Sequence, residues 1–310
     1  SYNLNKSIAV YGFGHFKFKK YLYGFLYPRI VNNPNSFPRY SGIPRDIERG
    51  GFSSGETDMS GIGFQNDWLS FQIGRGRECW GAGQDIQLAL SDFSSPYDYV
   101  ALSSNYGNLR VKYIHGFLES NNNKVNRYIT ARGVEYSTKS NFLIGLSETV
   151  IYSGYNRPID LGYLNPMSSH LEIELNDRLN NIGTSSANAV WMMSIDWMLT
   201  KTVRFSLNYL YDEFILDNVE KKNGKENGRA NSFSISYVPF NINKGILNLY
   251  LTRVMVGTPT FRHGNGMNNF VQRGNPLGYI FGSDFIEYTS GLNYLNKKNV
   301  ILNLETGFLS

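Results

Sequence analysis

The sequence predicts an all-β fold, namely a transmembrane antiparallel β-barrel of about 14–18 strands with long extracellular loops and short periplasmic turns. Three observations support this class. Apolar and polar residues alternate over long segments, short and long connections alternate along the chain, and a low charge accompanies a high aromatic content. Of the 310 residues, 18% are charged and 15% are aromatic, with a net charge of +5 and a mean hydropathy of −0.33.

The composition also excludes several classes of protein. Cys79 is the single cysteine, so an intramolecular disulfide is impossible, and we expect it to be a small buried apolar residue. The four histidines lie in different segments without ligand spacing, so we predict neither a metal nor a cofactor. The small, dispersed net charge argues against a nucleic-acid partner. No run of 18 apolar residues is present, which excludes a transmembrane helix.

Period-two alternation distinguishes strands from helices in this chain. In residues 202–211, apolar residues occupy the odd positions from Val203 to Tyr211, and polar residues occupy the even positions except Leu210. Residues 190–199 repeat the pattern. A tilted membrane-spanning strand needs about 9–11 residues, whereas a typical soluble strand has about 5–6. The length of these segments therefore favours a membrane barrel over a soluble sandwich.

Charged residues in the middle of strands are expected to face a wet lumen. They are Asp196, Arg204, Glu305, Arg110, Lys112 and Arg132.

Turn signals and long polar segments divide the chain into fourteen predicted strands within a single domain, 1–310. In chain order they cover residues 7–18, 21–31, 59–66, 67–74, 99–105, 109–118, 127–138, 141–152, 187–199, 202–214, 229–239, 246–256, 283–295 and 300–309. A further strand over 84–91 would raise the count to about 14–16, since closure with both termini on one side requires an even number.

One long connection has the pattern of a helix. Ser168–His170 could cap a helix over 168–182 with an apolar stripe at Leu171, Leu175, Leu179 and Ile182. We interpret it as a loop helix folded over the barrel mouth; the alternative is an active-site lid.

Catalytic motifs are missing from the sequence. It contains no GxSxG, HExxH, P-loop or CxxC pattern. Asp212 and Glu213 are adjacent, but neighbours in a strand point to opposite faces and cannot cooperate as an acid and a base. The sequence therefore predicts a protein that is not an enzyme.

Aromatic residues near strand ends are expected to form interfacial girdles, with a minority able to stack on sugar rings. These are Trp68, Trp80, Tyr97, Tyr99, Tyr155, Tyr163, Trp191, Trp197, Tyr279 and Phe281. Arginine and acidic side chains beside such rings can bind hydroxyl and carboxylate groups. The candidates for a carbohydrate site are Arg75, Arg77, Trp80, Asp85, Arg157, Asp212, Arg253, Arg262 and Arg273.

Five blocks in order over about 74–290 resemble the Wzi family of capsule assembly proteins. They are Gly74-Arg75 with Trp80-Gly81-Ala82-Gly83 and Leu88-Ala89-Leu90-Ser91; Tyr163-Leu164-Asn165-Pro166; Tyr211-Asp212-Glu213-Phe214; Tyr250-Leu251-Thr252-Arg253-Val254; and Gly274-Asn275-Pro276-Leu277-Gly278 with Gly282-Ser283-Asp284. The resemblance implies a bacterial outer-membrane barrel of about eighteen strands. It also implies a lectin-like protein that holds capsular or exopolysaccharide at the cell surface.

The expected partners are outer-membrane lipid and lipopolysaccharide, the polysaccharide itself, and proteins that dock at the loops. Three alternatives remain open at this point: a porin-like diffusion channel, a barrel subunit of a larger surface assembly, and an outer-membrane enzyme such as a lipase or deacylase.

Overall fold

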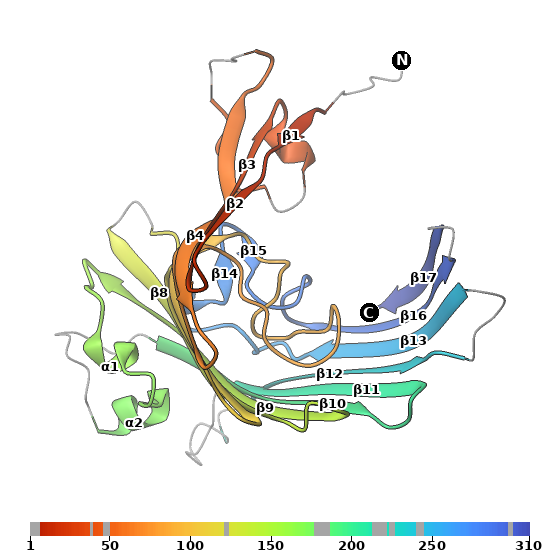
Figure 1. The fold of residues 1–310 in the computed structure, drawn as a ribbon. Helices are drawn as coiled ribbons and strands as arrows, with labels where there is room; N and C mark the ends of the chain where they lie inside the picture. The colour runs from red at the N-terminus through yellow and green to blue at the C-terminus, as the bar shows by residue number, and fades with distance from the viewer. Residues whose placement is uncertain are drawn as a thin grey trace.

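The computed structural model describes residues 7–37, 40–45, 50–120, 124–176, 187–212, 222, 227–239, 245–296 and 300–310. Its main feature is one 15-stranded antiparallel sheet that forms a curved wall (Figure 1). The strands of the wall are β1 (Ala9–Tyr11), β2 (Gly14–Phe18), β3 (Leu22–Val31), β4 (Ser54–Gln65), β5 (Leu69–Gly76), β6 (Tyr97–Tyr106), β7 (Leu109–Phe117), β8 (Val125–Ser137), β9 (Phe142–Tyr155), β10 (Ala187–Met198), β11 (Val203–Asp212), β12 (Gly228–Tyr237), β13 (Gly245–Val256), β16 (Phe285–Asn296) and β17 (Ile301–Leu309).

The predicted strands are confirmed. Residues 7–18 form two pieces, β1 and β2, which pair with different parts of β3 and make one interrupted edge. Residues 84–91 are not a strand of the wall, because they lie in the connection between β5 and β6. Strand β4 begins at Ser54, five residues before the predicted start. Its polar extension is held by ion pairs of Glu56 with Arg29 and of Asp58 with Arg77.

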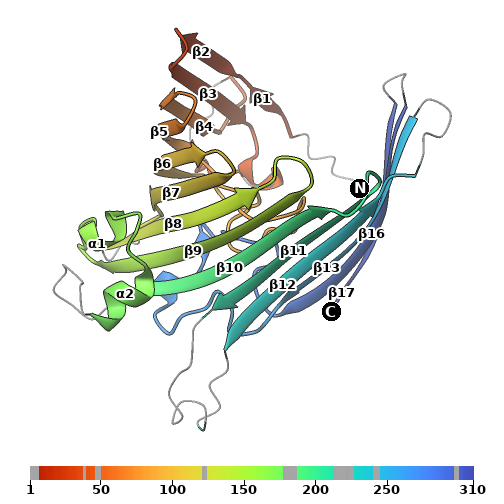
Figure 2. The same cartoon turned by 60° about the horizontal axis from the view of Figure 1, so that its bottom comes forward.

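Long connections and short turns alternate along the chain as predicted, so the wall has a loop end and a turn end. In outer-membrane barrels the loops are extracellular and the turns periplasmic. From β3 to β17 each strand of the wall pairs with the next wall strand in sequence, and β1 and β2 both pair with β3. Among the described residues, the β1/β2 edge and the β17 edge do not pair with each other, and the wall is open on that side (Figure 2).

The two faces of the wall differ in chemistry. On the outer face, Leu146 is 57% exposed, Leu251 57% and Leu304 58%. The residues that alternate with them, such as Thr252 and Glu305, face the concave side. An exposed, largely apolar outer face with a polar concave face is the pattern of a wall surrounded by lipid.

The aromatic residues divide between girdle and interior. Trp68 and Trp197, near the turn end, are 50% and 43% exposed, which agrees with an interfacial girdle. The girdle prediction is wrong for a second group, which is buried by tertiary packing. This group comprises Trp80, Tyr97, Tyr99, Tyr163 and Tyr279.

Two short helices, α1 (Leu161–Leu164) and α2 (His170–Leu175), lie beside β8, β9 and β10 (Figure 1). The Ser169 side chain accepts a hydrogen bond from the backbone N–H of Glu172, which caps α2. Among the described residues, neither helix is long or apolar enough to cross a bilayer. Leu179 and Ile182 of the predicted stripe lie outside the described residues.

The segment 157–176, which we call the cap, covers the outer face of the wall rather than the barrel mouth that we expected. The Tyr113 hydroxyl on β7 donates to the carbonyl oxygen of Tyr163, 2.9 Å away. The guanidinium of Arg132 donates to the carbonyl oxygen of Asn165, 3.1 Å away. Arg132 therefore does not point into the lumen as predicted. Its neighbours Ala131 and Gly133 face inward, so alternation directs its side chain outward, beneath the cap.

The cap makes stability dependent on pH through His170. Burial, with smaller contributions from Arg132 and His263, lowers the pKa of His170 from 6.5 to about 4. Between these two values the unfolded chain binds more protons than the folded chain, so the free energy of unfolding decreases as pH falls from 6.5 towards 4. The exposed carboxylate of Glu174, 3.4 Å from Nε2, is the acidic partner that faces the ring. Thermal unfolding should show a shallower decrease over this pH range for His170→Gln, and equal decreases in both proteins would contradict the assignment.

Candidate functional site

The concave face of the wall is occupied by two connections, which we together call the plug. They are residues 77–96, between β5 and β6, and residues 257–284, between β13 and β16. The second contains η2 (Gly266–Asn268) and a small ribbon of β14 (Val271–Gln272) and β15 (Asn275–Pro276). Figure 1 shows both connections inside the curve of the wall, orange and blue.

Backbone hydrogen bonds join the two connections of the plug. The N–H of Tyr279 donates to the carbonyl of Leu88 at 3.2 Å, and the N–H of Ser91 donates to the carbonyl of Leu277 at 3.0 Å. The Ser91 hydroxyl also donates to the carbonyl of Gly278. A Cβ atom at Gly278 would lie 1.7 Å from the Leu88 carbonyl oxygen, so this close approach requires glycine.

Asn208 on β11 fixes the plug to the wall. Its Oδ1 accepts the N–H of Ala82 at 2.7 Å, and its Nδ2 lies 2.9 Å from the Ala82 carbonyl oxygen and 3.2 Å from that of Ile86. The Ser232 hydroxyl on β12 donates to the same Ile86 carbonyl at 2.7 Å. Asn208 and Ser232 are fully buried, so these bonds satisfy polar groups that water cannot reach.

An apolar core lies between the plug and the loop half of the wall. Leu88 and Leu277 of the plug are fully buried in the same cluster as Ile129 and Leu210 of the wall. Burying each such side chain contributes about 1.5–3 kcal/mol. The loop half of the concave face is therefore filled with protein.

Cys79, at the start of the plug, is exposed rather than buried as predicted. Its neighbour Trp80 takes the buried position, with its indole N–H donating to Glu78.

Below the plug, towards the turn end, the concave face holds a cavity of about 820 Å³. The plug contributes Asp85, Phe93 and Phe281 as its roof. The inward positions of the wall strands supply the rest. The wall residues include Arg204, Ser206, Ser234, Ser236, Asn248, Tyr250, Thr252, Glu287, Thr289, Asn293, Asn303 and Glu305.

Two carboxylates of the cavity accept hydrogen bonds from tyrosines rather than from basic groups. The Tyr250 hydroxyl donates to Glu305 at 2.5 Å, and the Tyr279 hydroxyl donates to Glu287 at 2.5 Å. Burial, and then the bond to Glu287, raise the pKa of Tyr279. The hydroxyl of Tyr279 therefore stays protonated at neutral pH and continues to donate.

The guanidinium of Arg204 is the basic group that lines this cavity among the described residues. Asp196 holds it through two hydrogen bonds of 2.7 Å. Three carboxylates, those of Asp85, Glu287 and Glu305, line the same cavity. The cavity is therefore acidic.

The nine carbohydrate-site candidates do not converge on one place. Asp85 lines the cavity. Three further candidates hold the plug in place. Arg77 pairs with Asp58 of β4 at 2.6 Å, Asp212 of β11 accepts the backbone N–H of Phe261, and Trp80 is buried between plug and wall.

The five remaining candidates lie away from the cavity. Arg157 is buried in the cap, 3.4 Å from Asp160. Arg253 lies on the outer face, 2.7 Å from Asn231. Arg262 and Arg273 are exposed on the second connection of the plug, where Arg273 donates to the Ser41 carbonyl. Their role in binding stays a prediction.

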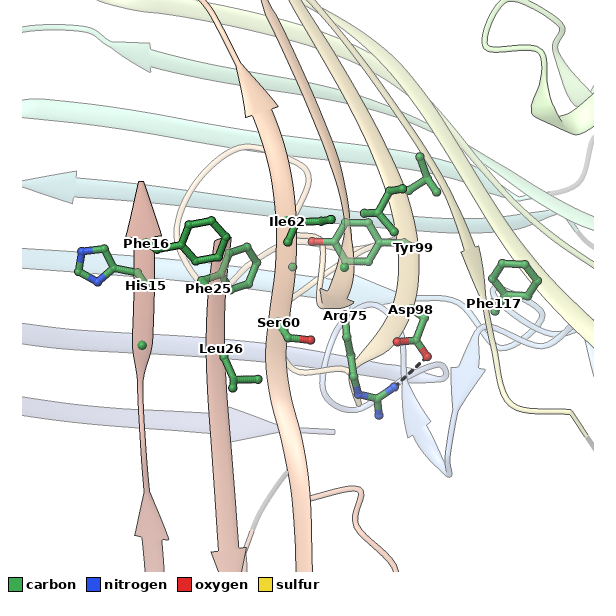
Figure 3. A pocket seen from close by; sticks show the side chains of 15 residues that line it. His15, Phe16, Phe25, Leu26, Ser60, Ile62, Arg75, Asp98, Tyr99 and Phe117 are labelled. Atoms are coloured by element: carbon green, nitrogen blue, oxygen red, sulfur yellow. Dashed lines mark hydrogen bonds and ion pairs between the residues drawn. The ribbon is translucent and has the colours of Figure 1, made fainter. Parts of the chain in front are cut away.

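Arg75, the last candidate, borders a separate hollow of about 780 Å³ on strands β2–β7 (Figure 3). It pairs with Asp98 at 3.2 Å. Leu26 and Ile62, which line the hollow, are 49% and 62% exposed on the outer face. This hollow therefore belongs to the lipid-facing surface and not to the concave site.

Most of the cavity is not among the predicted site residues. The sequence predicts an inward position for Arg204 and Glu305 but does not bring them into one site, and Asn248, Tyr250 and Glu287 are absent from the nine candidates. The signal that could have found them is the recurrence of polar residues on the inward positions of consecutive strands 246–256, 283–295 and 300–309.

The wall, the outward apolar face and the filled concave face define the fold of an outer-membrane β-barrel. No protein-family model matches the sequence, and no curated protein matches it significantly. Among solved structures, the fold is similar to Wzi of Escherichia coli, an outer-membrane protein involved in group 1 capsule assembly that is described as a carbohydrate-binding β-barrel. The TM-score is 0.69 at 13% identity, covering 98% of this chain and 64% of Wzi.

This chain thus spans 64% of the length of Wzi. It is also similar to OmpT, an outer membrane protein of Vibrio cholerae, with a TM-score of 0.51 and 12% identity over 98% of this chain and 78% of that one. At these identities the likeness establishes the fold.

Proposed function

We propose that this protein resides in the bacterial outer membrane and binds a capsular or exopolysaccharide at the cell surface without chemically altering it. The observation that carries the proposal is the plug: two connections, bonded to each other and to the wall, fill the loop half of the concave face. A filled lumen with a polar, aromatic-lined cavity suits retention of a ligand. The carbohydrate binding described for Wzi, whose fold is similar, supports the same function.

A porin-like channel is the second candidate, because charged side chains such as Arg204, Glu287 and Glu305 line the concave side of the wall. A diffusion channel needs a continuous wet path. The buried core between Leu88, Leu277 and the wall obstructs that path in the loop half, which favours the binding protein.

Two measurements on the full-length protein test this function. Reconstituted in planar bilayers, it should give no steady large channels. In solution, it should bind the surface polysaccharide of the organism that produces it, and cells lacking it should release more of that polymer. Steady large conductance would support the porin, whereas an absence of glycan binding would support a subunit that docks other proteins.

The remaining partners belong to the same proposal. Lipid and lipopolysaccharide would surround the outer face, and the exposed loops could dock proteins. We also propose that residues 1–310 form a single barrel domain.

A further inference from the structure

The cavity beneath the plug has the shape and surface of a site for part of a saccharide chain. Its volume, about 820 Å³, is large enough for several sugar rings. Phe281 is 46% exposed and Tyr250 is partly exposed, so both present ring surface to the cavity. An aromatic face packs against the C–H face of a pyranose.

The walls of the cavity also offer hydrogen bonds of both kinds. Hydroxyl groups on β12, β13 and β16, such as those of Ser234, Thr252 and Thr289, can donate and accept. Asn248 on β13 also lines the cavity, and its side-chain amide can donate and accept hydrogen bonds.

The charge of the cavity restricts which saccharide can enter. Glu287 and Glu305 each accept a hydrogen bond from a tyrosine. Among the described residues that line the cavity, the basic one is Arg204, which is already paired with Asp196. A uronate or phosphate group would meet these carboxylates at short range, and like-charge juxtaposition is unfavourable. Sugar hydroxyls, by contrast, can donate to the same carboxylate oxygens.

We infer that the cavity between the plug and the turn ends of β11–β17 binds a non-acidic stretch of saccharide. Tyr250 and Phe281 would stack on sugar rings, the amide of Asn248 would bind a hydroxyl, and Glu287 and Glu305 would accept hydroxyls while rejecting acidic sugars. This inference rests on the proposed function. It assigns recognition to the concave interior, which a saccharide would reach from the turn end because the plug fills the loop half, and not to the arginines of the rim.

The test uses oligosaccharides released from the producer's own polysaccharide and separated by anion exchange into non-acidic and acidic fractions. Titration calorimetry with the detergent-solubilised full-length protein should show binding of the non-acidic fraction. Tyr250→Ala combined with Phe281→Ala should weaken that binding by at least about tenfold, equivalent to 1.4 kcal/mol. Glu287→Gln combined with Glu305→Gln should improve binding of the acidic fraction by about the same factor.

Glu135→Gln is the matched control, because this inward carboxylate pairs with Arg110 outside the cavity; it should change neither affinity. Circular dichroism confirms that each variant is folded. Equal binding of both fractions by the unaltered protein, or unchanged affinities in the cavity variants, would overturn the inference while leaving the proposed function intact. If neither the intact polymer nor any fraction binds, the proposed function itself fails.

Discussion

Replacing Asn208 by Leu should release the plug from the wall and convert a closed protein into a leaky one. The substitution removes an acceptor from the Ala82 N–H and donors from the Ala82 and Ile86 carbonyls. Unpaired buried polar groups cost about 1–3 kcal/mol each, so we expect a loss of about 2–4 kcal/mol in the free energy of unfolding. Planar-bilayer recordings should show open events that the unaltered protein lacks.

Asn105→Leu is the control for this experiment. Asn105 also belongs to the wall, on β6, but it is exposed and lies at the turn end of that strand, away from the plug. It should leave conductance and stability nearly unchanged. If Asn208→Leu behaves like this control in both measurements, Asn208 does not hold the plug.

Replacing Glu148 by Ala should detach the cap from the outer face. Glu148 accepts the N–H of His170 and the indole N–H of Trp191, both at 2.9 Å, and forms an ion pair with Arg132 at 3.3 Å. Its side chain is 6% exposed. Removing one member of a buried ion pair leaves the other charge without compensation, at a cost of about 3–5 kcal/mol. Limited proteolysis within 157–176 should become fast, and the emission of Trp191 should change.

Glu135→Ala provides the contrast on the inward face. Glu135 pairs with Arg110, whose side chain is 42% exposed, and a solvated ion pair of this kind contributes less than about 1 kcal/mol. The two variants remove the same group from the same wall. Similar effects of both on cap proteolysis would show that the cap does not depend on Glu148.

The wall could be predicted from sequence because period two is a local signal. In strands such as 202–214, the alternation of apolar and polar residues is visible within the segment itself. Because nearly all the strands pair with the next wall strand in sequence, the order of the strands in the sheet follows from the order of the segments. The start of β4 could not be predicted, since Glu56 and Asp58 are stabilised in the strand by Arg29 and Arg77 from elsewhere in the chain. The outward position of Arg132 could not be predicted, because the cap that covers its side chain, residues 157–176, belongs to a later connection of the chain.

The cavity was harder to predict than the wall because its members come together only through the plug. Asp85 and Phe281 belong to connections without periodicity, and their position depends on contacts such as Ser91 with Gly278. The sequence blocks around Trp80 and Leu277, which resemble the Wzi family, lie in these two connections. Both residues are buried in the plug, so the blocks can be explained by packing of the plug as well as by ligand binding.

The plug also constrains the order in which the protein can acquire its native structure. Ser91 and Gly278 are 187 positions apart, and eight of the fifteen wall strands, β6 to β13, lie between them in sequence. Contacts of such long range carry a large loop-closure entropy and are expected to form after local strand pairing has brought the ends together. Assembly would therefore pass through a curved sheet with an empty interior. The filling of the lumen by the plug would then be the last step of folding.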